Sequence, residues 1–292
     1  MGSPLAWLLN FESDEELAIG GTFTPSAVLA GHLKRLREAH AERLLRPGDR
    51  ELGPGCEGLQ AEAWCPTPTA LDRIRAAGAI APPAPSFEVL RRVNSRAFCS
   101  SLARAGGQGF FARDETELHG GLAAADGVDR RGWLLKRNYG TSGRGQLRLS
   151  AESWTEQEAS WIACSWRAGG LRVEPFRQLD AEFSIHGWIT AQGQVSLGEP
   201  CWMQTDAAGS WLSTRLARPE EARAAEVAAL RASAQSCAQA MLEAGYFGPF
   251  GIDAYRWLDA AGNRHFESRS EINARYTLGW KVGFGDAQPS KA

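Results

Sequence analysis

Two carboxylates and one amide near the C-terminal end of the chain have the chemistry of hard oxygen ligands. Two predicted strands, 250–257 and 265–273, are joined by a short polar turn and form a hairpin. Side chains alternate between faces along a strand, so Glu271 and Asn273 share one face, and Asp253 can join them from the facing strand. Mg²⁺ prefers carboxylate and amide oxygens. The hairpin therefore predicts a divalent-metal site.

The same hairpin also carries arginines, which leave a second interpretation open. Asp253 and Glu271 can form ordinary ion pairs with Arg256, Arg269 or Arg275 instead of binding a metal. Arg275 has the same strand parity as Asn273, so its guanidinium can also hold a substrate carboxylate or a phosphate.

A lysine at the end of a predicted strand precedes a glycine-rich loop. The strand 132–137 carries Lys136, and the loop that follows contains Gly140, Thr141, Ser142, Gly143, Arg144 and Gly145. Glycines allow the backbone to approach an anion closely, and the amides, hydroxyls and cations can donate to phosphate oxygens. The order differs from a G-x-x-x-x-G-K-[ST] loop, because the lysine comes first. A surface hairpin with no ligand would have a similar composition.

A third group of polar residues follows a further strand. Glu174, Pro175 and Phe176 end the predicted strand 171–174, and Glu182 lies in the next. A strand edge there can offer backbone N–H and C=O groups to a planar ring such as adenine, and Glu182 can accept hydrogen bonds from ribose hydroxyls.

Composition excludes several classes of function. The 292 residues carry a formal net charge of -2, which does not favour nucleic acid or an anionic membrane as the main partner. No apolar run approaches the ~18 residues of a spanning helix, and no signal-peptide pattern is present, so a cytoplasmic location is expected. Six cysteines without a C-x-x-C pair are expected to be buried thiols, and the five histidines lack zinc-ligand spacing.

The residues that must position these groups divide into two parts. Residues 1–85 are predicted to form a small α/β domain, with a strand at 5–10, a helix beginning at Thr24-Pro25 and another beginning at Thr67-Pro68. Prolines 82, 83 and 85 form a linker. Ser86 caps a helix that Asn94 interrupts. The elements expected after it are a helix at 153–166, strands at 181–190, 195–197 and 210–215, and a long helix from Pro219 to Gly245.

The order of these features resembles the ATP-grasp superfamily. The resemblance rests on Lys136 with its glycine loop, Glu174-Pro-Phe, Glu182-Phe-Ser, Asp253 and Glu271-Ile-Asn-Ala-Arg. The last stretch is similar to the E-x-N-x-R stretch of the biotin-carboxylase branch, whereas the chain length is closer to D-alanine–D-alanine ligases. The resemblance implies an α/β (α+β) fold: a small N-terminal α/β domain and an ATP-grasp domain at 86–292. Its lid subdomain would span about 105–175 and its C-terminal subdomain about 176–285.

The resemblance also implies roles in binding Mg-ATP. Phosphate contacts would come from Arg96 and Lys136, with the loop residues Thr141, Ser142, Gly143 and Arg144 closing over them. Glu174 and Phe176 would face adenine, and Glu182 the ribose. One or two Mg²⁺ ions, or Mn²⁺, would be held by Asp253, Glu271 and Asn273. Arg275 and Arg215 would contact the substrate or a reaction intermediate.

Two departures from the superfamily pattern affect these roles. The hinge reads Glu-Pro-Phe-Arg-Gln-Leu, which puts the adenine contacts in doubt, and the 18-residue spacing from Asp253 to Glu271 is longer than in the short ligases.

The implied reaction is amide or peptide bond formation through an acylphosphate, on a small-molecule, amino-acid or peptide substrate, with a homodimer as one arrangement. A small-molecule kinase and a non-catalytic nucleotide-binding protein stay open as alternatives. Four tryptophans, Trp64, Trp202, Trp211 and Trp280, can either favour an aromatic or peptide substrate or belong to the core.

Overall fold

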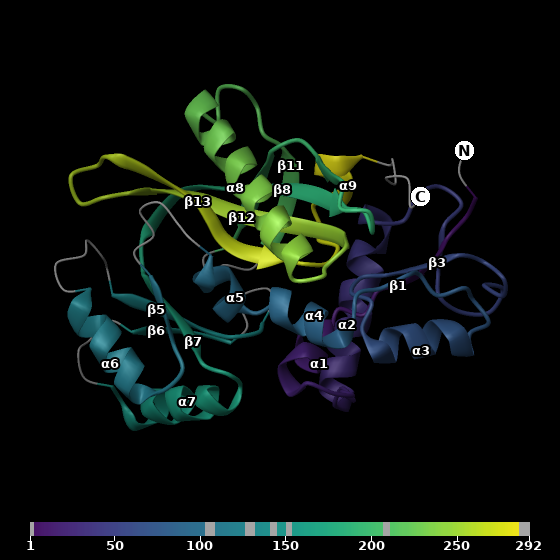
Figure 1. The fold of residues 1–292 in the computed structure, drawn as a ribbon, viewed down its shortest axis with the longest axis horizontal. Coiled ribbons are helices and arrows are strands. Elements are labelled where there is room, and N and C mark those ends of the chain that lie inside the picture. Colours follow the sequence, from purple (N-terminus) through teal and green to yellow (C-terminus); the bar gives the residue numbers. More distant parts are fainter. Residues whose placement is uncertain are drawn as a thin grey trace.

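A computed structural model of the chain describes residues 3–102, 109–125, 132–140, 145–149, 154–206 and 211–285. Within these residues the strands form three sheets, which follow one another along the sequence (Figure 1). No helix in the described part of the chain is long and apolar enough to cross a membrane. The structure confirms a mixed α and β fold.

The N-terminal sheet is small and parallel. It has the order β2 (Arg50–Glu51), β1 (Ala6–Leu8), β3 (Ala61–Ala63). Its helices are α1 (Ser13–Ile19), α2 (Ala27–His40) and α3 (Pro68–Ala76), with a 3-10 turn, η1 (Ala41–Arg43). The cap of α2 is Ser26, whose hydroxyl accepts from the Leu29 amide, so the expected start at Thr24-Pro25 is too early.

Two short helices connect this part to the rest. Helix α4 (Phe87–Val93) begins after Ser86, and α5 (Arg96–Ser101) begins after Ser95; both serines accept a backbone N–H at the first turn. Asn94 ends α4, as expected. Its side-chain Nδ2 donates to the Leu90 carbonyl, and its Oδ1 accepts from the Ala274 amide, just after β13 (Arg264–Asn273).

A four-stranded sheet lies within the predicted lid subdomain, and we call it the lid sheet; helices cover one of its faces. Its order is β4 (Phe110–Ala112), β7 (Leu171–Pro175), β5 (Trp133–Arg137), β6 (Gln146–Leu149). Helices α6 (Glu115–Ala124) and α7 (Glu156–Arg167) contribute Leu118 and Ile162 to a core with Leu135 and Val173. Since side chains alternate, the other face of this sheet is left for polar residues.

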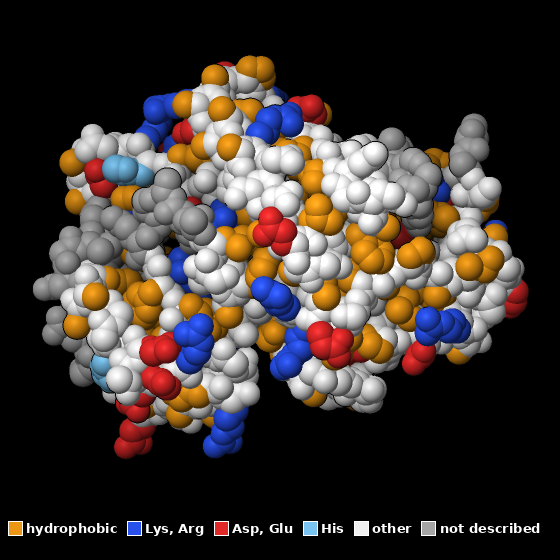
Figure 2. Space-filling model, viewed as in Figure 1, with side chains coloured by type: hydrophobic (Ala, Val, Ile, Leu, Met, Phe, Trp, Pro, Cys, Tyr) orange, Lys and Arg blue, Asp and Glu red, His pale blue; other side chains and the backbone are white. Residues whose placement is uncertain are grey.

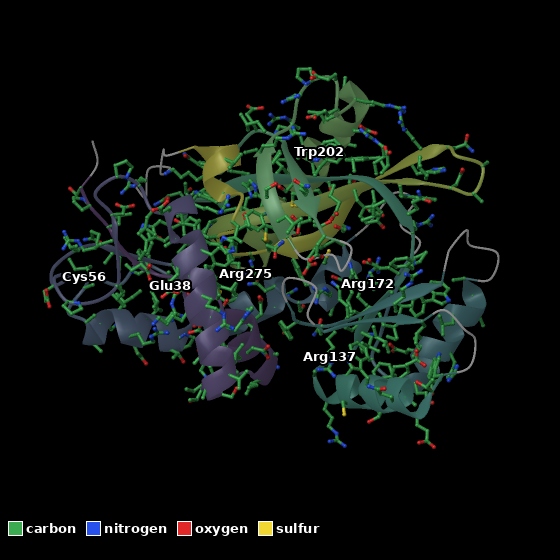
Figure 3. The ribbon with its side chains drawn as sticks, turned by 180° about the vertical axis from the view of Figure 1, so that it is seen from behind. Glu38, Cys56, Arg137, Arg172, Trp202 and Arg275 are labelled. Carbon is green, nitrogen blue, oxygen red and sulfur yellow. The ribbon has the colours of Figure 1, made fainter. Side chains whose placement is uncertain are left out.

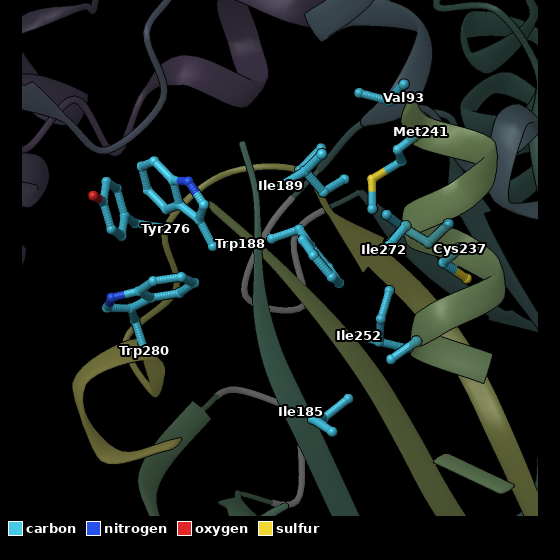
Figure 4. Packing of buried hydrophobic residues seen from close by; sticks show 14 of the residues in the cluster. Val93, Ile185, Trp188, Ile189, Cys237, Met241, Ile252, Ile272, Tyr276 and Trp280 are labelled. Atoms are coloured by element: carbon cyan, nitrogen blue, oxygen red, sulfur yellow. The ribbon is translucent and has the colours of Figure 1, made fainter. Parts of the chain in front are cut away.

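The large sheet forms the centre of the molecule. It has the order β11 (Trp211–Leu216), β10 (Cys201–Thr205), β8 (Gln178–Ile189), β12 (Gly248–Leu258), β13 (Arg264–Asn273), and β9 (Val195–Leu197) pairs with β8. Helix α8 (Ala224–Glu243) covers one face, where Cys237 and Met241 pack near Ile252 and Ile272 (Figure 4). Helix α9 (Trp280–Phe284) follows the last strand.

Two local expectations need correction. Helix α8 begins at Ala224 rather than Pro219, because residues 219–221 form a turn in which the Glu221 carboxylate accepts from the Arg218 amide. The thiols are free, but Cys164 is exposed on α7, whereas the other five are buried. On the described part of one face, acidic and basic side chains are interspersed, in keeping with the small net charge (Figure 2).

Candidate functional site

A cleft of about 1250 Å³ lies between the lid sheet and the large sheet. Lys136 and Glu174 line it from the lid, and Glu182, Asp253 and Glu271 line it from the large sheet. The large-sheet residues stand on the face opposite α8, because their neighbours Phe183, Ile252 and Ile272 pack in the core. Figure 3 labels Arg172 on the lid subdomain and Trp202 on the large sheet.

Asp253, Glu271 and Asn273 come together on this face. Asp253 pairs directly with Glu271 across β12 and β13, and the Asn273 Nδ2 donates to the Asp253 Oδ2 at 3.0 Å. A regular hairpin would put Asp253 opposite Arg269. The irregularity between Asp253 and Tyr255 shifts the register by two residues, so the carboxylates face each other.

The electrostatics of this cluster fit a cation. Burial and the charge of Glu271 raise the pKa of Asp253 to about 7, although the hydrogen bond from Asn273 acts in the opposite direction. A divalent ion would offset the repulsion between the two carboxylates. Among the described residues, no group of three His, Cys, Asp or Glu side chains could hold a metal, so the Asn273 amide is needed as the third ligand. Two carboxylates and an amide suit Mg²⁺.

Arg96 is the cation that contacts this cluster. Its Nη2 donates to the Glu271 Oε1 at 2.6 Å, and its guanidinium also donates to the carbonyls of Arg137 and Gly140 at 2.6 and 3.1 Å. The buried side chain at the start of α5 therefore links the metal-ligand candidate Glu271 to the beginning of the glycine loop.

The hairpin arginines that could have paired with the carboxylates have other partners. Arg256 binds Glu226 and Asp180, and the Arg269 Nη2 donates to the Leu102 carbonyl at 2.9 Å. The Arg275 Nη2 lies 3.1 Å from Asp14 of α1, and its guanidinium stacks over Trp64. Each of these arginines therefore has a partner other than Asp253 and Glu271, and Arg275 also lines the cleft.

On the lid side, the predicted adenine residue Glu174 is bound by two cations. The Lys136 Nζ lies 2.9 Å from its Oε2, and the Arg172 Nε lies 3.2 Å from its Oε1. Strand alternation places all three on the face of the lid sheet opposite Leu135 and Val173, and Lys136 and Glu174 line the cleft there. Glu174 therefore holds Lys136 in position, while it also lines the cleft.

The predicted hinge residue Phe176 and the ribose candidate Glu182 also line the cleft. Phe176 lines the cleft with the Arg148 guanidinium 3.6 Å from its ring centroid, while its amide donates to the Gly132 carbonyl. Glu182 accepts from the Thr205 hydroxyl, and burial raises its pKa. The loop residues Thr141, Ser142, Gly143 and Arg144 lie outside the described residues.

Arg215 does not itself line the cleft. Its side chain is 44% exposed, both Nη atoms bind Glu221 at 2.6 Å, and its guanidinium lies 5.2 Å from the ring of Trp202, which does line the cleft. Sequence reasoning missed His186, which lines the cleft and contacts Ser184 and Thr277 at 3.3 and 3.1 Å. The alternation Glu182, Ser184, His186 along β8 was the signal that could have found it.

Comparisons with known proteins give matches at the level of structure. No protein-family model matches the sequence, and no curated protein matches it. A biotin carboxylase from Campylobacter jejuni in complex with beta-gamma-ATP is similar with a TM-score of 0.55 at 16% identity, covering 80% of this chain and 56% of that one. This chain therefore spans just over half the length of that enzyme.

Two further solved structures cover nearly all of this chain. An N5-carboxyaminoimidazole ribonucleotide synthetase from Thermus thermophilus has a TM-score of 0.52 at 18% identity, with 95% of this chain and 74% of that one covered. D-alanyl-alanine synthetase A from Vibrio cholerae has a TM-score of 0.50 at 13% identity, with 94% and 89% covered. The sheets, their order and these similarities together show that the chain has the ATP-grasp fold.

Proposed function

We propose that this chain is a Mg-ATP-dependent ligase that joins a carboxylate to an amine through an acylphosphate. The observation that carries the proposal is the cluster on the large sheet: Asp253 faces Glu271 directly, with Asn273 hydrogen-bonded to Asp253. The cluster lines the same cleft as Lys136 of the lid sheet. Oxygen ligands on one wall and a buried cation on the other suit a metal-bound polyphosphate.

Each charged residue then has a part in binding the nucleotide. Asp253, Glu271 and Asn273 would hold Mg²⁺, which when bound supplies positive charge to the phosphate oxygens. Lys136 donates to phosphate from the lid side. Arg96 can move from Glu271 to the phosphates once a metal shares that carboxylate, because its guanidinium already lies beside Gly140.

The reaction needs no nucleophile from the protein. A substrate carboxylate oxygen attacks the γ-phosphorus, the bond to the bridging oxygen of ADP breaks, and an acylphosphate forms. An amine then attacks the carbonyl carbon, loses a proton, and expels inorganic phosphate, which leaves an amide. The residues of the cleft position the reactants, neutralise charge and exclude water, since both walls are formed by packed sheets.

The test is ADP release from Mg-ATP in the presence of paired carboxylates and amines, with mass spectrometry of the products. We expect a new amide, and we expect Glu271→Gln and Asn273→Ala to lower turnover at least about 100-fold. Arg215→Ala, outside the cleft, is the matched control and should keep wild-type turnover. The ligase would be refuted by a stable phosphorylated product formed without an amine, which would favour a kinase. Wild-type turnover in both cluster variants would remove the metal assignment.

A further inference from the structure

The far end of the cleft has an aromatic and aliphatic wall. Its apolar lining comes from five places in the chain: the segment after β1, helix α2, the segment after β3, strand β11 and the segment after β13. Residues that line it are Phe11, Leu33, Leu36, Trp64, Trp211 and Leu278. Trp280, by contrast, is buried in the core, where it stacks on Phe284. Three of the four tryptophans noted in the sequence therefore face the cleft, since Trp202 lines it too.

The rings of this wall are held in fixed positions. Phe11 meets Trp64 edge to face, with centroids 4.8 Å apart, and the Arg275 guanidinium lies 5.2 Å from the Trp64 ring. His40 of α2 packs edge to face on Trp211 at 5.4 Å, and the Trp211 Nε1 donates to the Thr214 hydroxyl at 2.8 Å. Rings fixed in this way form a preorganised apolar surface.

The cations beside this wall lie over its ring faces, and the Arg43 guanidinium is 5.0 Å from the Trp211 ring centroid. Burial and the nearby charge of Arg43 lower the pKa of His40, which is therefore neutral near pH 7. Arg275 is already paired with Asp14. A charged substrate side chain placed against these rings would lose its hydration, and a cation would also be repelled by Arg43 and Arg275, whereas an apolar side chain would gain from burial.

Arg275 connects this wall to the metal-ligand cluster. It lies two residues after Asn273 on the same chain segment, lines the same cleft, and stacks on Trp64. Leu33 and Leu36 of α2 line the same cleft. A substrate that reacts beside Asp253 and Glu271 would thus extend its body past Arg275 toward α2.

We infer that the substrate carboxylate belongs to a small molecule with an aromatic or branched aliphatic side chain, seated between Leu36, Trp64 and Trp211. The inference rests on the proposed ligase function and names the substrate class for it. Full burial of such a side chain corresponds to a preference of about 10- to 100-fold in kcat/KM over a charged side chain of similar size.

The experiment uses the full chain, Mg-ATP and hydroxylamine as a common amine, with hydroxamate as the product. L-phenylalanine and L-leucine are compared with L-glutamate and L-lysine. Leu36→Arg puts a cation on the wall. Val28→Arg is the matched control, because Val28 lies on the same helix, is 85% exposed and does not line the cleft. We expect the wild type and Val28→Arg to prefer the apolar acids, and Leu36→Arg to lose that preference and gain activity on L-glutamate.

Equal use of charged and apolar acids by the wild type, or an unchanged preference in Leu36→Arg, would overturn the inference. The melting temperature with Mg-ATP separates it from the proposed function, because a rise shows that the nucleotide binds whatever the acid preference. If no rise occurs, the ligase proposal fails. In that case the inference is tested by calorimetry with L-phenylalanine alone. Binding that is lost in Leu36→Arg supports the apolar wall as the site of the substrate side chain, and absence of binding overturns the inference.

Discussion

Lys136 offers the sharpest test of the nucleotide site, because Glu174, the carboxylate that it binds, is also bound by Arg172. Its side chain is 11% exposed, and its Nζ lies 2.9 Å from Glu174. With nucleotide bound, the ammonium would donate a charge-assisted hydrogen bond to a phosphate. Such a bond contributes about 1.5–3 kcal/mol. Lys136→Met should therefore weaken binding of a non-hydrolysable ATP analogue with Mg²⁺ about 10- to 150-fold.

The stability of Lys136→Met should suffer much less than its affinity. Removing one partner of a buried ion pair usually costs about 3–5 kcal/mol, because the other charge is left uncompensated. Here Arg172 stays 3.2 Å from Glu174, so the carboxylate keeps a counter-ion. We expect a loss in the free energy of unfolding of about 1–3 kcal/mol, measured by denaturant titration.

Arg172→Met is the matched control. It removes the other cation from Glu174, but Arg172 does not line the cleft. The two variants should lose similar stability, while only Lys136→Met loses affinity in calorimetry. Equal affinities for the two variants would refute the assignment of Lys136 to phosphate and leave it as a structural counter-ion.

Three other perturbations follow from buried and exposed charges. Burial lowers the pKa of His186 from 6.5 to about 4, so the neutral ring is favoured in the folded state. The free energy of unfolding should therefore fall by up to about 3 kcal/mol as the pH drops from 6.5 to 4. His186→Gln should reduce this pH dependence in thermal melts. Asp14→Ala should destabilise the fold by about 3–5 kcal/mol in urea, because it leaves Arg275 buried without its ion-pair partner; a loss below 1 kcal/mol would contradict this. Arg215→Ala removes an exposed pair with Glu221 and a contact with the Trp202 ring, and should leave the midpoint of urea unfolding nearly unchanged because solvent screens the pair; a clear fall in the midpoint would contradict this.

Several elements could be predicted from the sequence because their signals are local. The β12–β13 hairpin follows from a polar turn between two apolar strands, the start of α4 follows from the cap Ser86, and its end was expected at Asn94. Elements with weak local signals were not predicted. Helix α6 contains Gly120 and Gly121, and strand β4 has three residues.

The sequence by itself determined which groups could bind a metal and a phosphate, since parity along β13 puts Glu271 and Asn273 on one face whatever the rest of the chain does. The tertiary structure decided their partners. The shifted register across β12 and β13 set Asp253 against Glu271, and folding brought Arg96 to Glu271 across 175 residues and Arg275 to Asp14 across 261. The local periodicity of a strand predicts the face on which a side chain lies, but packing between distant segments determines which residues it contacts.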